Sequence, residues 1–203
     1  MDDQHRHKLF TSVVGHGMLT FCQASTLVHL LAKSSHIPGD ICEFGVNAGR
    51  TSCLMAACSS KKLWMYDSCD GLPAPEGIDG IAVFRGGLAA PASAIENTFN
   101  ENAVPMATLI PAWFCDLKPD QLPDKIAFAH IDADLYRSTL DALNLVYPRV
   151  SSGGIVLFHD WDTGHIPAVE KAIREFMTGK PEQVIVPRRL DGSTGQQAYF
   201  VKT

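Results

Sequence analysis

The sequence predicts an α/β protein whose core is one mostly parallel β-sheet with helices on both faces. Two observations carry this prediction. Short apolar strands alternate with helical stretches from residue 40 onward, which is typical of βαβ units. The chain has 203 residues, enough for one domain with a sizeable core but hardly for two. We therefore expect a single domain over residues 1–203, with an N-terminal helical cap over 1–38 and the α/β core over 39–203.

The individual elements follow from the spacing of the apolar residues. Short apolar runs predict strands, and apolar residues three or four positions apart predict helices. The helical pattern is clearest near the C-terminus, where Ile166, Val169, Ile173 and Met177 share one face. The expected strands are Ile41–Val46, Leu63–Asp67, Thr108–Pro111, Ile126–Ile131, Ile155–His159, Val184–Val186 and Ala198–Lys202. The expected helices are Val14–Lys33, Thr51–Ser59, Ala92–Asn102, Ser138–Tyr147 and Pro167–Thr178.

The last two expected strands are connected differently from the others. Only residues 190–197 separate them, which is too short for a crossover helix, so we expect an antiparallel hairpin. The result is a Rossmann-like, seven-stranded, mostly parallel sheet with a C-terminal antiparallel hairpin. This arrangement resembles that of class I methyltransferases, whereas simple dinucleotide-binding domains usually lack the hairpin.

Composition and charge argue against several classes of protein. With 17 basic and 22 acidic residues the net charge is −5, which gives no general electrostatic reason to bind nucleic acid or anionic lipid. No apolar run approaches the roughly 20 residues of a membrane helix. Because residues 1–8 are polar, we expect no secretory signal. The six cysteines lack C-x-x-C spacing, which favours reduced, buried thiols over a zinc site or a catalytic cysteine. We expect a cytoplasmic protein without membrane or nucleic-acid partners.

A glycine-containing turn follows the first expected strand, in the segment EFGVNAGRTS over residues 43–52. Gly45 and Gly49 allow a tight turn and a close approach of backbone to ligand, and Arg50 and Thr51 open the next helix. The spacing differs from the G-x-G-x-x-G pattern that cradles a pyrophosphate. S-adenosylmethionine has no phosphate but carries a sulfonium and an amino group, so the acidic Glu43 suits this cofactor better than NAD.

Two further carboxylates follow the second and third expected strands. Asp67 comes about 20 residues after the glycine turn, where a carboxylate can bind both ribose hydroxyls, and we assign Ser68 beside it to the same site. Asp116 is placed to meet the adenine amino group. Each carboxylate alone could equally be a solvated loop residue. Residues 68–91 are rich in Gly, Pro and Ala, and we expect this long loop to be a mobile lid over the cofactor.

A second polar group follows the fourth and fifth expected strands. The segments HIDAD (130–134) and FHDWD (158–162) end at the same sheet edge as the glycine turn. Carboxylates that gather in one place repel each other unless they bind a cation or shift their pKa values. We therefore expect a divalent metal held by Asp132, His159 and Asp160. Carboxylate ligands favour Mg²⁺, whereas a histidine ligand favours Mn²⁺, Fe²⁺ or Zn²⁺.

Such a metal suits the transfer of a methyl group to an oxygen. The cation would orient the acceptor hydroxyl and lower its pKa, and either Asp132 or Asp134 could act as general base. Simpler interpretations remain open for single residues. Asp134 could cap the following helix, Asp162 could shape its loop, and His130 could be a satisfied core histidine.

Five motifs, in this order, resemble the macrocin O-methyltransferase family: GDICEFGVNAGR (39–50), YDSCDGLPAP (66–75), IPAWF (110–114), HIDADLYRST (130–139) and GGIVLFHD (153–160). The similarity runs from about residue 39 to residue 177. It implies a metal-dependent enzyme that uses S-adenosylmethionine to methylate sugar hydroxyls on natural products such as macrolides. It also implies that the loop after Asp67 is a substrate lid. The ligands it implies are Asp132 and Asp160 for the metal, and Glu43, Gly45 and Asp67 for the cofactor.

The chain departs from this family at two places. His159-Asp160 stands where relatives usually have paired acidic residues, which bears on the identity of the metal. The chain is also short at its N-terminus, where relatives carry substrate-binding helices. We therefore expect a smaller acceptor, or one whose site is shaped by a second subunit, and the relatives suggest a homo-oligomer.

Three other functions remain open. The D-x-D motif at residues 132–134 also occurs in metal-dependent glycosyltransferases, an NAD-linked oxidoreductase would share the sheet, and a binding module could keep the fold without catalysis. The missing G-x-G-x-x-G pattern argues against the oxidoreductase. The glycosyltransferase is disfavoured because a D-x-D motif does not account for the glycine turn. We expect an O-methyltransferase that acts on a hydroxyl of a small molecule or a sugar-bearing natural product.

Overall fold

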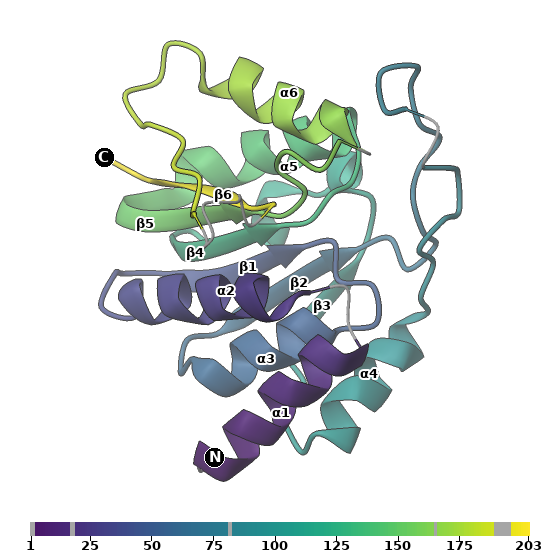
Figure 1. Ribbon diagram of the computed structural model, residues 1–203, viewed down its shortest axis with the longest axis vertical. Helices are drawn as coiled ribbons and strands as arrows, with labels where there is room; N and C mark the ends of the chain where they lie inside the picture. The colour runs from purple at the N-terminus through teal and green to yellow at the C-terminus, as the bar shows by residue number, and fades with distance from the viewer. Residues whose placement is uncertain (1–2, 17–18, 81–82, 165, 189–195) are drawn as a thin grey trace.

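The computed structural model describes residues 3–16, 19–80, 83–164, 166–188 and 196–203 (Figure 1). Within these residues, six strands form one sheet in the order β3-β2-β1-β4-β5-β6. The first five strands pair in parallel, and β6 runs antiparallel to β5. The expected α/β class with a mostly parallel sheet is confirmed. The strands are β1 (Asp40–Phe44), β2 (Leu63–Asp67), β3 (Thr108–Pro111), β4 (Ile126–Ile131), β5 (Val150–Phe158) and β6 (Ala198–Val201).

The expectation of a seventh strand is wrong for the described residues. The segment Val184–Val186 makes only one isolated antiparallel bridge, between Ile185 and Tyr199. Pro187, which follows directly, has no N–H to donate to a ladder, and this limits regular pairing of the segment with β6. Residues 189–195, which include most of the expected hairpin loop, lie outside the described residues.

Six α-helices surround the sheet in the described part of the chain. Four lie within about two residues of their expected bounds, as helix ends usually do. The single helix expected over Val14–Lys33 is wrong, because two helices occupy the N-terminal region. Thr20 starts the second one: its hydroxyl accepts from the N–H of Gln23, whose side chain accepts from the N–H of Thr20. The helices are α1 (Asp3–His16), α2 (Phe21–Lys33), α3 (Arg50–Cys58), α4 (Ala92–Glu101), α5 (Tyr136–Val146) and α6 (Pro167–Met177).

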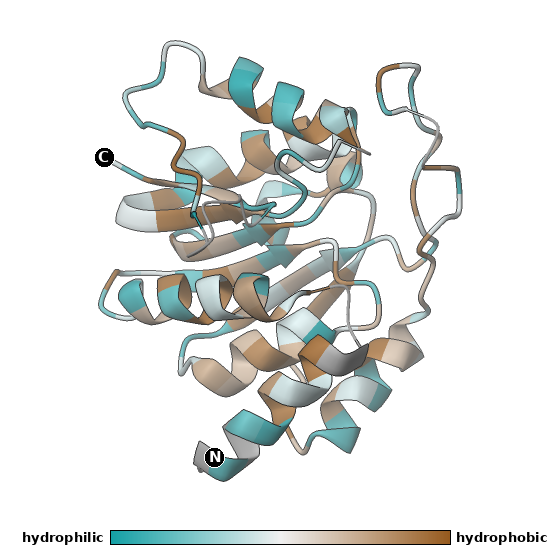
Figure 2. Ribbon diagram, viewed as in Figure 1, coloured by the Kyte–Doolittle hydropathy of each residue, from teal (hydrophilic) through white to brown (hydrophobic). Residues whose placement is uncertain are grey.

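Two apolar cores lie on opposite faces of the sheet. Helices α1 to α4 cover one face, and α5 and α6 cover the other, so the expected helices on both faces are confirmed (Figure 1). Because strand side chains alternate, Ile41 of β1 belongs to the first core, whereas Cys42 and Phe44 belong to the second. Figure 2 shows α6 with its hydrophobic side turned toward the sheet and its hydrophilic side outward. No helix among the described residues is both long enough and apolar enough to span a bilayer.

The segment between β2 and α4 contains no helix or strand among its described residues, 68–80 and 83–91. Its base is closed by two backbone hydrogen bonds: the N–H of Leu72 donates to Gly87 at 2.8 Å, and the N–H of Gly86 donates to Leu72 at 2.9 Å. In Figure 1 this segment stands beside the carboxyl ends of the strands. Its position suits a lid, while its mobility stays a prediction.

Candidate functional site

The carboxyl ends of β1, β2, β3, β4 and β5 surround one cleft. Ligands of such sheets bind at this edge because the loops that follow the strands converge there. The cleft brings together seven of the residues that the sequence assigns to the site. Those in its lining are Gly45, Asp67, Ser68, Asp132, Asp134, His159 and Asp160.

The turn after β1 requires glycine at its start. Gly45 has a φ of +87°, and a Cβ built there would lie 1.8 Å from the carbonyl oxygen of Asp132. This close approach is part of the sheet, because the N–H of Asp132 donates to the carbonyl of Phe44 at 2.8 Å. The backbone of the expected cofactor turn therefore touches the first residue of the expected metal site. Gly49 instead packs on α4, where a Cβ would lie 2.8 Å from Ile95 Cγ2.

Asp67 shapes the glycine turn from the end of β2. Its Oδ2 accepts from the N–H groups of Val46 at 2.7 Å and Asn47 at 2.9 Å, and its Oδ1 accepts from the N–H of Cys69 at 2.8 Å. A carboxylate has about four acceptor positions, so Asp67 retains capacity to accept from a ligand in the cleft. Ser68 stabilises the following loop, where its hydroxyl donates to the carbonyl of Gly71 at 2.8 Å.

Gly49 and four other residues expected to bind the cofactor lie outside the lining of this cleft. Arg50 and Thr51 are half-buried in the first turn of α3, and Asp116 is exposed in the short 3₁₀ helix over residues 114–116. Glu43 is 1% exposed and lies within β1. Its carboxylate accepts from the hydroxyl of Ser52 and lies 2.9 Å from His130 Nδ1. Burial raises the pKa of Glu43, against the lowering effect of His130. Contacts of these four with a cofactor stay predictions.

Several lining residues are absent from the sequence-based assignment. Asn47 lies in the glycine turn, and its side-chain amide donates to the carbonyl of Leu88 at 2.7 Å, which ties the turn to the end of the loop. Trp113 and Phe114 follow β3 and offer an apolar wall. The signal for them was present in the IPAWF motif, which precedes Asp116 at the same strand end. Others in the lining are Leu72, Pro73, Ala112, Ser138 and Ile166.

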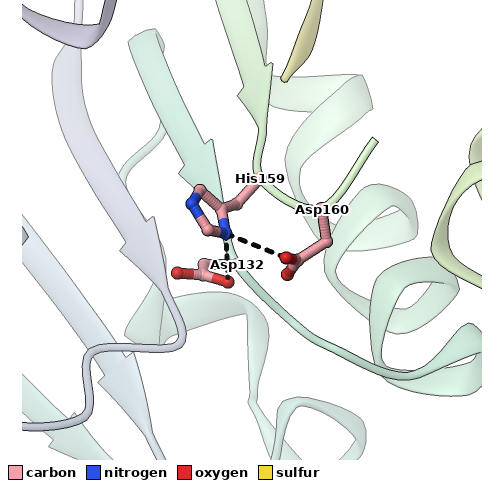
Figure 3. A group of neighbouring side chains, drawn as sticks. All are labelled: Asp132, His159 and Asp160. Carbon is pink, nitrogen blue, oxygen red and sulfur yellow. Dashed lines mark ion pairs between the residues drawn. The ribbon is translucent and has the colours of Figure 1, made fainter. Parts of the chain in front are cut away.

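Three side chains form a compact acidic trio, which we define as Asp132, His159 and Asp160 (Figure 3). His159 Nδ1 lies 3.4 Å from Asp132 Oδ1 and 3.1 Å from Asp160 Oδ1. One donor atom from each residue lies within 4.8 Å of the others. Asp160 Oδ2 is buried and has no hydrogen-bond partner among the described residues. Buried polar atoms normally find a partner, so these donors fit a bound cation.

Electrostatics separate the roles of the two carboxylates after β4. Burial raises the pKa of Asp134, and the negative charges of Asp132 and Asp160 raise it further, to about 8. Burial would also raise the pKa of Asp132, but the nearby imidazole of His159 outweighs it and lowers the value to about 2. Burial lowers the pKa of His159, yet the Asp132 carboxylate raises it well above its ordinary value. Asp132 therefore offers a permanent charge, and Asp134 offers a carboxyl that takes up a proton near neutrality.

The strand order, the antiparallel final strand and the cleft at the carboxyl edge define a class I methyltransferase fold. The structure of the O-methyltransferase NovP superposes with a TM-score of 0.84 at 21% identity, over 98% of both chains. The calicheamicin methyltransferase CalS11 superposes with a TM-score of 0.71 at 21% identity, over 98% of this chain and 91% of the other. These similarities establish the fold.

Sequence comparison defines the family more narrowly. Residues 8–186 match the family described as Macrocin-O-methyltransferase (TylF), and the chain belongs to this family. The 8-demethyl-8-(2,3-dimethoxy-alpha-L-rhamnosyl)-tetracenomycin-C 4'-O-methyltransferase of Streptomyces olivaceus is 32% identical over 69% of this chain and 58% of the relative. The demethyldecarbamoylnovobiocin O-methyltransferase of Streptomyces niveus is 32% identical over 63% of this chain and 54% of the relative. The chain thus matches little more than half the length of these relatives.

Proposed function

We propose that the protein is an S-adenosylmethionine-dependent O-methyltransferase that acts on a hydroxyl of a small molecule or a sugar-bearing natural product. One observation carries the proposal: a single cleft joins the turn held by Asp67 to the acidic trio, and Gly45 connects the two through its contact with Asp132. Family membership and the activities named for the relatives support the same chemistry.

Three side chains on one side of the cleft would bind S-adenosylmethionine. Asp67 would accept from the ribose hydroxyls, since its carboxylate faces the cleft at the end of β2. Trp113 and Phe114 would contact the adenine ring, because aromatic side chains bury flat apolar surface efficiently. The bound cofactor supplies an electrophilic methyl group. These residues would orient that group toward the acceptor and would take no part in the chemical step.

The acidic trio would hold a divalent metal. Mg²⁺ is favoured by the two carboxylates and Mn²⁺ is the other candidate, given the imidazole of His159. When bound, such an ion supplies a Lewis acid that orients an acceptor hydroxyl and lowers its pKa. Asp134 would remove the hydroxyl proton as general base, because it lines the same cleft as the acidic trio but is not one of its three ligands. Asp132, whose carboxylate lies in the acidic trio, suits the ligand role instead.

Calorimetric titration with S-adenosylmethionine and with UDP-sugars tests the cofactor. We expect S-adenosylmethionine to bind preferentially, and preferential UDP-sugar binding would favour the D-x-D glycosyltransferase instead. Turnover on a panel of hydroxyl-bearing acceptors, with Mg²⁺ or Mn²⁺, then tests the reaction. Methylation that EDTA stops supports the whole proposal, and methylation that EDTA leaves intact removes its metal part. Cofactor binding without turnover on any acceptor would favour a binding module.

The same proposal covers the kind of acceptor, the location of the protein and its oligomeric state. The acceptor would be a small molecule rather than nucleic acid, in keeping with the net charge of −5. We also propose that the protein is cytoplasmic and that it forms a homo-oligomer. Size-exclusion chromatography with light scattering would measure the oligomeric state directly.

A further inference from the structure

A buried polar network lies beneath the cleft, on the face of the sheet that α3 covers. Glu43 of β1 and His130 of β4 are register partners, and the Glu43 carboxylate lies 2.9 Å from His130 Nδ1. The hydroxyl of Ser52 in α3 donates to the other carboxylate oxygen. His130 is fully buried and Glu43 is 1% exposed. None of the three lines the cleft, so the proposed reaction leaves this network without a role.

The network reaches the acidic trio through His130. His130 of β4 is the register partner of Leu157 in β5. Side chains two apart along a strand point to the same face, so His159 lies on the same face of the sheet as Leu157 and His130. The two imidazole rings pack edge to face, with centroids 6.1 Å apart. Among the described residues, Nε2 of each ring is buried without a hydrogen-bond partner. Figure 3 shows the other nitrogen of His159 turned toward Asp132 and Asp160.

The contacts of the two rings suit complementary tautomers. While Glu43 is ionised its carboxylate only accepts, so His130 Nδ1 then carries the shared proton, and in a neutral ring His130 Nε2 is left as an acceptor. A histidine that offers Nδ1 to a cation must carry its proton on Nε2. His159 would then carry a buried N–H and His130 a buried acceptor, on two rings whose centroids lie 6.1 Å apart. One buried water, or a small rotation of either ring, would join them.

We propose that Glu43 and His130 are positioning residues that hold the His159 imidazole with Nδ1 turned toward the two carboxylates. The inference rests on the proposed metal site and extends it inward to residues that touch neither metal nor substrate. Outer partners of this kind fix the orientation of a ligand ring, and their loss typically weakens metal binding about 10–100-fold. Glu43, which the sequence suggests as a cofactor contact, would thus serve the metal side of the cleft.

Metal binding to the full-length chain tests the inference without any need for an acceptor. Mn²⁺ affinity is measured by calorimetry, and the absorption spectrum of bound Co²⁺ reports ligand geometry. His130→Phe removes the nitrogen but keeps the ring, and Glu43→Gln keeps the shape but removes the charge. Glu182→Gln is the control, because Glu182 also has little exposed surface and its carboxylate accepts hydrogen bonds from Tyr147 and Lys202, outside the cleft lining.

We expect His130→Phe to weaken Mn²⁺ binding about 10–100-fold and to change the Co²⁺ spectrum, with S-adenosylmethionine affinity within a few-fold of wild type. Glu43→Gln should show a smaller loss in the same direction, and Glu182→Gln none. If His130→Phe does not fold, Glu43→Gln decides alone. Wild-type affinity and spectrum in a folded variant would overturn the inference only. A wild-type chain that binds neither ion would overturn the metal part of the proposed function and this inference with it.

Discussion

The carboxylate of Asp79 accepts a hydrogen bond from the backbone N–H of Tyr136 at 2.7 Å, although 57 residues separate the two. Tyr136 is the first residue of α5, and Leu135 before it provides no side-chain cap. A residue of the long loop therefore caps the helix that begins just after Asp134. The other oxygen of Asp79 accepts from the N–H of Glu76 at 2.7 Å, and the side chain is 1% exposed. The loop is thus docked beside the acidic trio by one buried carboxylate.

Asp79→Ala should loosen the loop and destabilise the chain by about 1–2 kcal/mol, because a helix loses its cap and two N–H groups lose their acceptor. Urea denaturation measures the stability. Trypsin cleavage after the exposed Arg85 reports loop docking and should become faster. Asp70→Ala, at an exposed position of the same loop, is the control and should change neither. Unchanged cleavage in Asp79→Ala would show that other contacts dock the loop.

Asp67→Ala should weaken S-adenosylmethionine binding more than tenfold while leaving Mn²⁺ affinity within a few-fold. Three backbone N–H groups lose their acceptor, so the turn over Val46 and Asn47 relaxes and the ribose loses its partner. Each lost hydrogen bond to a charged group is worth about 1.5–3 kcal/mol. Calorimetry with each ligand measures both effects. Asp67→Asn keeps one acceptor oxygen and should lie between wild type and Asp67→Ala.

Asp132→Ala should show the opposite pattern. The acidic trio loses one of its two carboxylates, so metal binding and methylation should both be lost. S-adenosylmethionine affinity should stay within a few-fold, because the side chain belongs to the metal side of the cleft. Near-normal turnover in this variant would contradict the metal assignment. Asp120→Ala, at an exposed position in another loop, should behave as wild type.

Gly45→Ala should be strongly destabilising, by more than about 2 kcal/mol, because a positive φ is combined with a steric overlap. The added Cβ would lie 1.8 Å from the Asp132 carbonyl oxygen, so either the turn or the end of β4 must move. Both cofactor and metal affinities should therefore fall together. Gly77→Ala is the control, since a Cβ there meets nothing within 4 Å. A stable Gly45→Ala chain with normal binding would refute the coupling of the two sites.

Glu182 should contribute stability that depends on pH. Burial alone would raise its pKa, but hydrogen bonds from Lys202 and Tyr147 outweigh burial and lower it from 4.5 to about 2. A lowered pKa means that the folded state favours the charged form. The contribution is therefore full above pH 4.5 and is lost as the pH falls toward 2. Urea denaturation of wild type and Glu182→Gln should differ most near pH 6 and converge in acid, and a constant difference would contradict this.

The sequence predicts the sheet well because apolar alternation reports burial directly. It predicts less well where local chemistry overrides the pattern. The helix expected over residues 14–33 is interrupted because Thr20 and Gln23 form a capping box, and this box is stronger than the continuity of the apolar residues. The expected strand at 184–186 shrinks to one bridge because Pro187 cannot donate to a ladder. The capping box and the proline are both present in the sequence, but the spacing of the apolar residues points to a continuous helix and a regular strand instead.

The sequence by itself determined that a glycine turn, Asp67 and the acidic trio gather at one edge, because parallel strands bring all their carboxyl ends together. Only the tertiary structure decided which way individual side chains turn. Glu43 faces the interior because strand side chains alternate and its register partner is His130. Asp116 faces solvent because a 3₁₀ turn follows β3 and leaves Trp113 and Phe114 against the cleft. Register and turn geometry depend on contacts between distant segments, which the order of residues along the chain does not reveal.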